Sequence, residues 1–109
     1  MRTRYRTPVL AALLPIVLLG AGCNLVKAKA AFKDGNRLYK EENYRKAILE
    51  YDKAVSLKPN FAEAHYQLGN ALFDSGKRED ALAHYELAVR IKPNFTDARD
   101  ALDRLRAAQ

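Results

Sequence analysis

Few residues in this chain are of a type that carries chemistry. There is one cysteine, Cys23, and two histidines, His65 and His84. A lone cysteine excludes an internal disulfide and any zinc or iron–sulfur site built from several cysteines. The two histidines lie on different expected helices, with no cysteine or paired carboxylate at metal-ligand spacing beside them. We therefore expect core or surface histidines, no metal, no cofactor and no enzymatic activity.

The glycines and the charged residues also argue against catalysis and nucleic-acid binding. No glycine-rich phosphate loop is present, because Gly69 falls inside an expected helix. The net charge is +6, but Arg2, Arg4 and Arg6 all precede the first apolar run, and from Cys23 onward there are 16 basic and 13 acidic residues. Such a mildly basic segment predicts no nucleic-acid partner. With 109 residues, the chain has room for one small domain.

The residues that precede Cys23 have the pattern of an export signal. A basic start is followed by an apolar run over residues 9–19, broken by Pro15, and then by small residues at 20–22. A membrane-spanning helix needs about 20 apolar residues, more than this run supplies. The basic start, the short apolar run and the small-residue end predict a signal peptide over residues 1–22.

The sequence Leu19-Gly20-Ala21-Gly22-Cys23 resembles the lipobox of bacterial lipoproteins, with Gly20 where that motif usually has a large aliphatic residue. The resemblance implies cleavage before Cys23 and acylation of its thiol and new amino terminus, which would anchor residues 23–27 as a linker at a membrane. Asn24 is not the aspartate that tends to retain such proteins on the inner membrane. The resemblance therefore implies an outer-membrane anchor facing the periplasm. An ordinary secretory signal or an uncleaved anchor is the alternative.

The rest of the chain contains a repeat of 34 residues. Residues 28–61 and 62–95 align with 13 identities, and each copy ends in Lys-Pro-Asn-Phe. Within each copy the apolar residues have helical spacing, and Gly76, Pro59 and Pro93 mark breaks. We expect an all-α fold of tandem helical hairpins, with helices at about 28–41, 44–57, 62–75, 78–91 and 96–107. Asn60 and Asn94 are the expected N-caps of the third and fifth helices.

The repeat resembles the tetratricopeptide repeat (TPR), through a set of residues at matching places in both copies. These are Gly35, Leu38, Ala47, Tyr51, Ala54 and Pro59 in the first, and Leu68, Gly69, Leu72, Ala81, Tyr85, Ala88 and Pro93 in the second. The resemblance implies an α-solenoid with TPR 1 at 28–61, TPR 2 at 62–95 and a polar capping helix within 96–109. Gly35 and Gly69 would let the paired helices approach closely.

In TPR proteins the first helix of each unit lines a concave groove. The resemblance implies that the floor of this groove consists of six residues: Phe32, Asn36, Tyr39, Tyr66, Asn70 and Phe73. Aromatic rings and amides suit an extended peptide. The alternative is that these side chains only pack between helices. Some relatives bind a free C-terminal carboxylate through basic residues, but Phe32, Asp97 and Ala101 stand at those places here, so we expect a different ligand class.

Together these features predict a membrane-anchored adaptor or scaffold of the bacterial cell envelope that binds a peptide or protein partner in its groove. The alternative is a structural subunit that self-associates through its repeat ends, without a groove ligand. Size favours this alternative, because about three repeats are generally needed for a stable array and this chain has two repeats and a cap.

Overall fold

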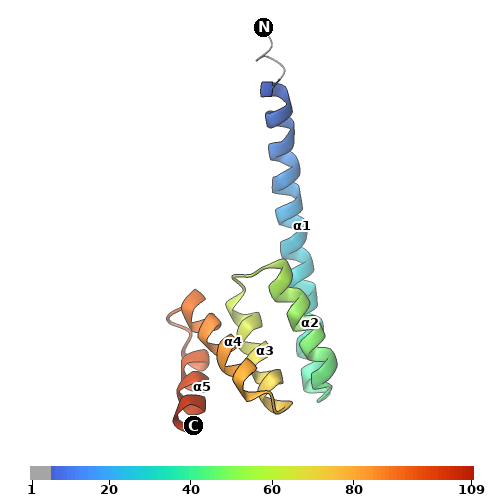
Figure 1. Ribbon diagram of the computed structural model, residues 1–109. Helices are drawn as coiled ribbons and strands as arrows, with labels where there is room; N and C mark the ends of the chain where they lie inside the picture. Colours follow the sequence, from blue (N-terminus) through green and yellow to red (C-terminus); the bar gives the residue numbers. More distant parts are fainter. Residues whose placement is uncertain (1–5) are drawn as a thin grey trace.

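The computed structural model describes the backbone of residues 6–109 and the side chains of residues 22–109. Within this part of the chain there are five helices and no strand: α1 (Arg6–Lys40), α2 (Tyr44–Leu57), α3 (Ala62–Asp74), α4 (Arg78–Ile91) and α5 (Thr96–Ala107). Figure 1 shows α1 with α2 and α3 with α4 as successive hairpins, with α5 against the last of them. The predicted all-α solenoid is thereby confirmed.

Helix α1 differs from the prediction at its start, because it begins at Arg6 rather than near residue 28 and has no break at the expected linker 23–27. Among the residues described with side chains, Ala28 is the first buried one of α1, and residues 22–27 are all exposed. Residues 1–21, nearly all of the predicted signal peptide, lie outside the part described with side chains. Among the described residues, no helix has the length and apolar character required to cross a bilayer.

The paired helices pack closely because small residues line their crossings. Ala47, Ala54, Ala81 and Ala88 are completely buried. A Cβ atom built on Gly35 would lie 2.6 Å from the ring of Tyr51, and one on Gly69 would lie 2.6 Å from the ring of Tyr85. Real Cβ atoms do not approach other atoms so closely, so the two glycines make room for the two tyrosine rings, as the repeat predicted.

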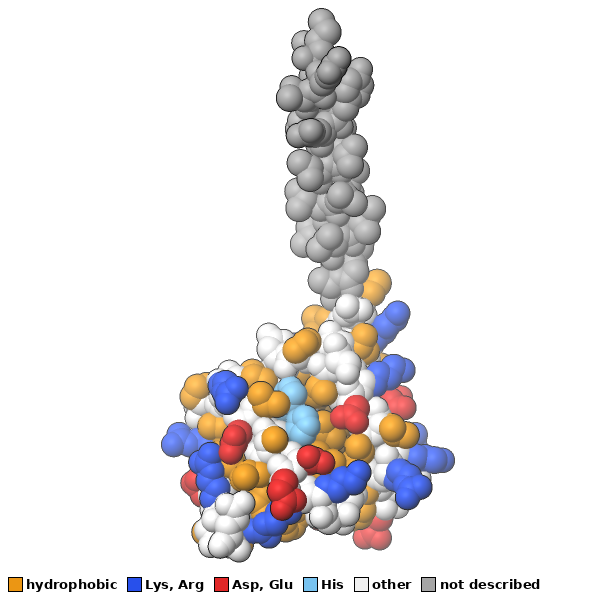
Figure 2. All heavy atoms as spheres, viewed as in Figure 1, with side chains coloured by type: hydrophobic (Ala, Val, Ile, Leu, Met, Phe, Trp, Pro, Cys, Tyr) orange, Lys and Arg blue, Asp and Glu red, His pale blue; other side chains and the backbone are white. Residues whose placement is uncertain are grey.

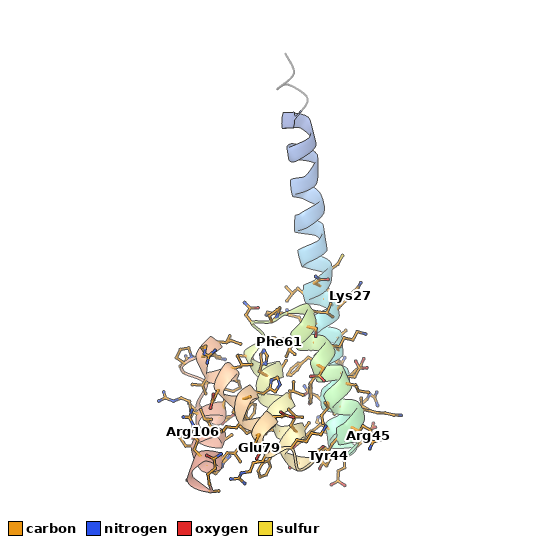
Figure 3. All side chains as sticks on the ribbon, viewed as in Figure 1. Lys27, Tyr44, Arg45, Phe61, Glu79 and Arg106 are labelled. Atoms are coloured by element: carbon orange, nitrogen blue, oxygen red, sulfur yellow. The ribbon has the colours of Figure 1, made fainter. Side chains whose placement is uncertain are left out.

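The repeated Lys-Pro-Asn-Phe segment forms the turn between successive units. Phe61 is the N-cap residue of α3 and is buried, with its ring centroid 4.9 Å from that of Phe32 on α1. The amine of Lys58 lies 4.8 Å from the centroid of the same ring, a cation–π contact. Figure 3 shows Phe61 and Lys27 toward one end of the helical hairpins and Tyr44 toward the other.

The predicted asparagine N-caps are wrong. Phe61 and Phe95 occupy the N-cap positions of α3 and α5, and neither helix start has a side-chain cap hydrogen bond. The cap position is used for packing instead, because it lets the phenylalanine ring reach the neighbouring hairpin. Asn43, which the prediction did not include, does cap a helix: its Oδ1 accepts from the backbone N–H of Lys46 in α2.

Helix α5 closes the array as predicted. It buries Ala98, Ala101, Leu102 and Leu105 against α4, and its polar side chains are exposed. The exposed charged residues are Asp97, Arg99, Asp100, Asp103, Arg104 and Arg106.

Candidate functional site

Two of the six predicted groove residues, Phe32 and Tyr66, take part in packing between units. The Phe32 ring contacts Phe61 and lies 6.0 Å from Tyr51, centroid to centroid. Tyr66 makes the equivalent pair of contacts one repeat later, 5.1 Å from Phe95 and 6.0 Å from Tyr85. Both side chains are partly buried against the main core. Their first role is therefore to join each hairpin to the turn that follows it.

The two predicted asparagines hold the buried tyrosines. The hydroxyl of Tyr51 donates to Oδ1 of Asn36 at 2.6 Å, and the hydroxyl of Tyr85 donates to Oδ1 of Asn70 at 2.6 Å. Burial raises the pKa of each tyrosine to about 12, because an apolar environment disfavours the phenolate. Each hydroxyl therefore remains a proton donor at neutral pH.

Tyr39, at the end of α1, connects the first hairpin to the second. Its hydroxyl donates to the carboxylate of Asp74 in α3, and its ring lies 5.2 Å from that of Tyr44. Burial, followed by the hydrogen bond to Asp74, raises the pKa of Tyr39 well above its usual value. Tyr39 is thus engaged with its own chain on both its ring and its hydroxyl.

The sixth predicted groove residue, Phe73, lines an open pocket together with Asn70. This pocket, which we call the α3–α5 pocket, has a volume of about 310 Å³ and lies between α3, α4 and α5. Phe73 is 47% exposed there. The lining consists of Asn70, Phe73, Arg78, Tyr85, Ala101, Arg104, Leu105 and Ala108.

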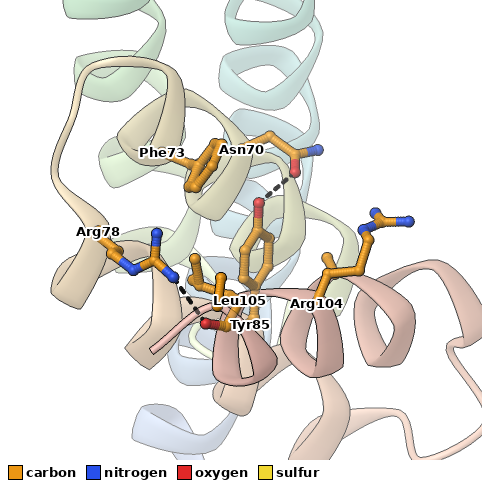
Figure 4. A pocket seen from close by; sticks show the side chains of 8 residues that line it. Asn70, Phe73, Arg78, Tyr85, Arg104 and Leu105 are labelled. Carbon is orange, nitrogen blue, oxygen red and sulfur yellow. Dashed lines mark hydrogen bonds between the residues drawn. The ribbon is translucent and has the colours of Figure 1, made fainter.

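Two cations flank the apolar centre of the α3–α5 pocket. In Figure 4, Arg78 and Arg104 lie on opposite sides of Tyr85 and Leu105. A terminal nitrogen of Arg78 donates to the backbone oxygen of Leu105 at 2.9 Å. Within residues 22–109, neither arginine is part of an ion pair. The pocket thus combines an apolar surface with two positive charges that no carboxylate neutralises in the described chain.

The two pocket arginines were not predicted as site residues. The polar, water-facing surface predicted for α5 is correct for the exposed side chain of Arg104, but a polar surface does not identify the residues that lie next to Arg104. A signal was available in the repeat alignment. Arg78 replaces Tyr44, and Ala108 replaces Asp74, at equivalent places of successive units. These replacements change an aromatic and acidic setting into a basic one.

The two histidines, 19 residues apart in sequence, meet in the structure. Nδ1 of His65 lies 3.1 Å from Nδ1 of His84, and Nε2 of His65 lies 2.8 Å from the backbone oxygen of Pro59. His65 is buried, as expected for a core histidine. Figure 2 shows the two side chains together on one face. Among the described residues, no cluster of three or more histidine, cysteine or acidic side chains is arranged to hold a metal.

The predicted lipidation site, Cys23, is an exposed free thiol on α1, within the exposed stretch that precedes Ala28. This position leaves the sulfur accessible for modification. It does not by itself indicate whether the residue is acylated.

Comparisons with known proteins place this arrangement in a family. A family model described as "TPR repeat" matches residues 35–76, and one described as "Tetratricopeptide repeat" matches residues 62–95. The chain contains tetratricopeptide repeats. A search of curated proteins finds no match.

Solved structures show the same fold. The TPR chain is similar to the crystal structure of MamA, with a TM-score of 0.73 and 26% identity over 75% of this chain and 48% of that chain. The TPR2B domain of yeast Sti1 in a pHsp70 complex has a TM-score of 0.73 and 22% identity, covering 76% of this chain and 66% of that one. The TPR2AB domain of Sti1 in a pHSP90 complex has a TM-score of 0.73 and 20% identity, covering 94% of this chain and 40% of that one. The TPR chain thus spans about half the length of MamA.

Proposed function

We propose that this TPR protein is a lipid-anchored adaptor of the bacterial cell envelope, which binds a protein partner at the α3–α5 pocket and acts by binding rather than by catalysis. The observation that carries the binding function is the pocket itself. Most of the predicted groove residues are engaged with their own chain, whereas Phe73 and Arg104 line the pocket with exposed side chains. The Sti1 domains in pHsp70 and pHSP90 complexes support protein recognition as the class of function.

The anchor is proposed from the sequence. The lipobox-like residues before Cys23 support acylation at that thiol, and Asn24 supports the outer membrane, facing the periplasm. One acyl chain gives marginal membrane binding and two or more give stable anchoring, at about 0.8 kcal/mol for each buried CH₂. The repeats would then be tethered to the membrane without spanning it.

Site-specific photo-crosslinking in cells tests the binding function. A photoreactive residue at position 104 reports on the pocket, and one at position 90 is the matched control. Arg90 is also an exposed arginine, but it lies 12 residues beyond Arg78 on α4, about 18 Å along the helix axis. We expect a discrete protein adduct from position 104 and not from position 90. Equal adducts from both positions would argue against the pocket as the binding surface.

Metabolic labelling with an alkyne fatty acid tests the anchor. We expect the full chain to incorporate the label and to fractionate with outer membranes, and we expect Cys23→Ser to lose both properties. A soluble, unlabelled wild-type protein would contradict the proposed anchor while leaving the binding function open.

Self-association is the second candidate, and exposed apolar side chains favour it. Leu49 on α2 is 64% exposed and Val26 on α1 is 69% exposed, and such side chains can form contacts between copies. Sedimentation of the protein over a range of concentrations distinguishes the candidates. A stable monomer at micromolar concentration would exclude the self-associating subunit.

A further inference from the structure

The two repeats differ at equivalent places, and the α3–α5 pocket lies where three of these differences meet. Between α1, α2 and α3, Tyr39 packs on Tyr44 and donates to Asp74. One repeat later, Phe73 replaces Tyr39, Arg78 replaces Tyr44 and Ala108 replaces Asp74. Phe73 has no hydroxyl and Ala108 has no carboxylate, so this bridge cannot form. These replacements surround the α3–α5 pocket.

The apolar part of the α3–α5 pocket is suited to one hydrocarbon side chain. Phe73, Ala101 and Leu105 supply the apolar surface. The polar groups beneath it are already paired, since the hydroxyl of Tyr85 donates to Asn70, whose own amide donates to Oε1 of Gln67 at 3.0 Å. A polar side chain entering this part would lose its hydration without gaining these partners. An apolar side chain has no such cost.

The charged rim adds a requirement for an anion. Arg78 and Arg104 carry charges that form no ion pair within residues 22–109. Asp74 is a nearby acidic residue, and its carboxylate accepts the hydrogen bond of Tyr39. A charge-assisted hydrogen bond from a guanidinium to a carboxylate is stronger than a hydrogen bond between neutral groups. A ligand carboxylate is the group that complements this rim.

We infer that the α3–α5 pocket recognises an internal peptide segment in which an apolar side chain of leucine size adjoins an aspartate or glutamate. This inference rests on the proposed binding function and specifies its ligand. The apolar side chain lies against Phe73, Ala101 and Leu105, and the carboxylate accepts from Arg104, with Arg78 on the opposite side. A free C-terminus carries the same chemical group as an aspartate or glutamate side chain, so the test includes a peptide that ends in one.

The test is an NMR titration of the isotope-labelled full chain in detergent with four hexapeptides. The probe is acetyl-Ser-Gly-Leu-Glu-Gly-Ser-amide. The second peptide replaces glutamate by glutamine, the third replaces leucine by serine, and the fourth repeats the probe with a free C-terminus. We expect the probe to shift the signals of Phe73, Ala101 and Leu105 with roughly millimolar or tighter affinity. We expect the second and third peptides to bind at least about fivefold more weakly.

Two variants connect the binding to the pocket. Arg104→Gln should weaken binding of the probe about fivefold or more, whereas Arg90→Gln, with the same loss of charge, should leave it unchanged. Phe73→Ala should weaken binding of the probe and of the glutamine peptide alike, because it removes apolar surface. Both pocket side chains are exposed, so the variants should keep the fold, which circular dichroism verifies.

Three results with the peptides would overturn the inference: the probe shows no saturable binding, the glutamate and glutamine peptides bind equally, or only the peptide with a free C-terminus binds. Equal effects of Arg104→Gln and Arg90→Gln would also overturn it. Binding of only the peptide with a free C-terminus would assign the pocket to a terminal carboxylate. If any of these occurs while position 104 still crosslinks to a protein in cells, the ligand class is wrong and the proposed function stands.

Discussion

The Nδ1 atoms of His65 and His84 lie 3.1 Å apart, and the two rings meet edge to edge. Their centroids are 5.4 Å apart and their planes are inclined by 20°. The carbonyl oxygen of Pro59 can only accept, so Nε2 of His65 carries a proton and donates to it. When His65 is neutral, its Nδ1 accepts, and Nδ1 of His84 must be the donor. The hydrogen bond between the two rings therefore needs one of the two Nδ1 atoms to be free of a proton.

This pairing makes stability depend on pH. Burial, followed by the proximity of His65, lowers the pKa of His84 below 6.5, although Asp52 on α2 and Asp80 on α4 oppose the shift. A lowered pKa means that the folded state binds fewer protons than the unfolded state. The stabilisation is therefore present above pH 6.5 and is lost as the pH falls below that value.

Chemical denaturation at pH 7.5 and pH 5.0 measures this effect. We expect the free energy of unfolding to fall on acidification, and to fall less in His84→Gln, whose amide can still donate to His65 but does not titrate. Carboxylates that titrate in both proteins cancel in the comparison. An identical pH dependence of the two proteins would show that the histidine pair is not responsible.

The contact between Gly69 and Tyr85 predicts the effect of adding one methyl group. Gly69→Ala gains about 1 kcal/mol in helix propensity, but its Cβ would lie 2.6 Å from the Tyr85 ring. Overpacking typically costs about 1–3 kcal/mol. We expect this cost to exceed the gain in helix propensity, so thermal denaturation should give a lower melting temperature for Gly69→Ala than for the wild type. When Gly69→Ala is combined with Tyr85→Leu, the loss of stability should be smaller than the sum of the losses in the two single variants. Strict additivity would mean that the ring is not the obstacle.

The hydrogen bond from Tyr51 to Asn36 predicts that removing the hydroxyl of Tyr51 lowers the free energy of unfolding. Tyr51 is completely buried, so Tyr51→Phe deprives the amide oxygen of Asn36 of its donor. Leaving such a group unsatisfied costs about 1–3 kcal/mol, measurable by urea denaturation. Tyr44→Phe is the control, since Tyr44 is less buried than Tyr51 and its ring contact with Tyr39 does not depend on the hydroxyl. A similar loss in the control would contradict this account.

Glu42 and Gly76 occupy equivalent places in the two repeats and have opposite expected responses to substitution. Both have positive φ, 59° at Glu42 and 83° at Gly76. This conformation suits glycine and strains other residues. We expect Glu42→Gly to raise the free energy of unfolding by about 0.5–1 kcal/mol and Gly76→Ala to lower it by about 1 kcal/mol. If both changes were destabilising, backbone conformation would not dominate at Glu42.

The helices could be predicted closely from the sequence, whereas the side-chain partnerships could not. Pro59, Pro93 and Gly76 mark physical limits on helix continuation, so the bounds of α2, α4 and α5 agree with the predicted ranges. The predicted N-cap positions were wrong because Phe61 and Phe95 occupy them, with their rings against Phe32 and Tyr66. The helical period shows which face of a helix is apolar, but it does not show which residues of neighbouring helices meet. The contact between His65 and His84 and the position of Arg104 depend on that packing.

The distance between Cys23 and the repeats has a mechanical consequence. Cys23 precedes Ala28, the first buried residue among those described with side chains, by five positions on the same helix, a rise of about 7–8 Å. A hydrogen-bonded helix of this length does not swivel as a glycine-rich tether does. A group attached to Cys23 would therefore be held about one and a half helical turns from the first repeat, rather than at the variable distance that a flexible linker allows.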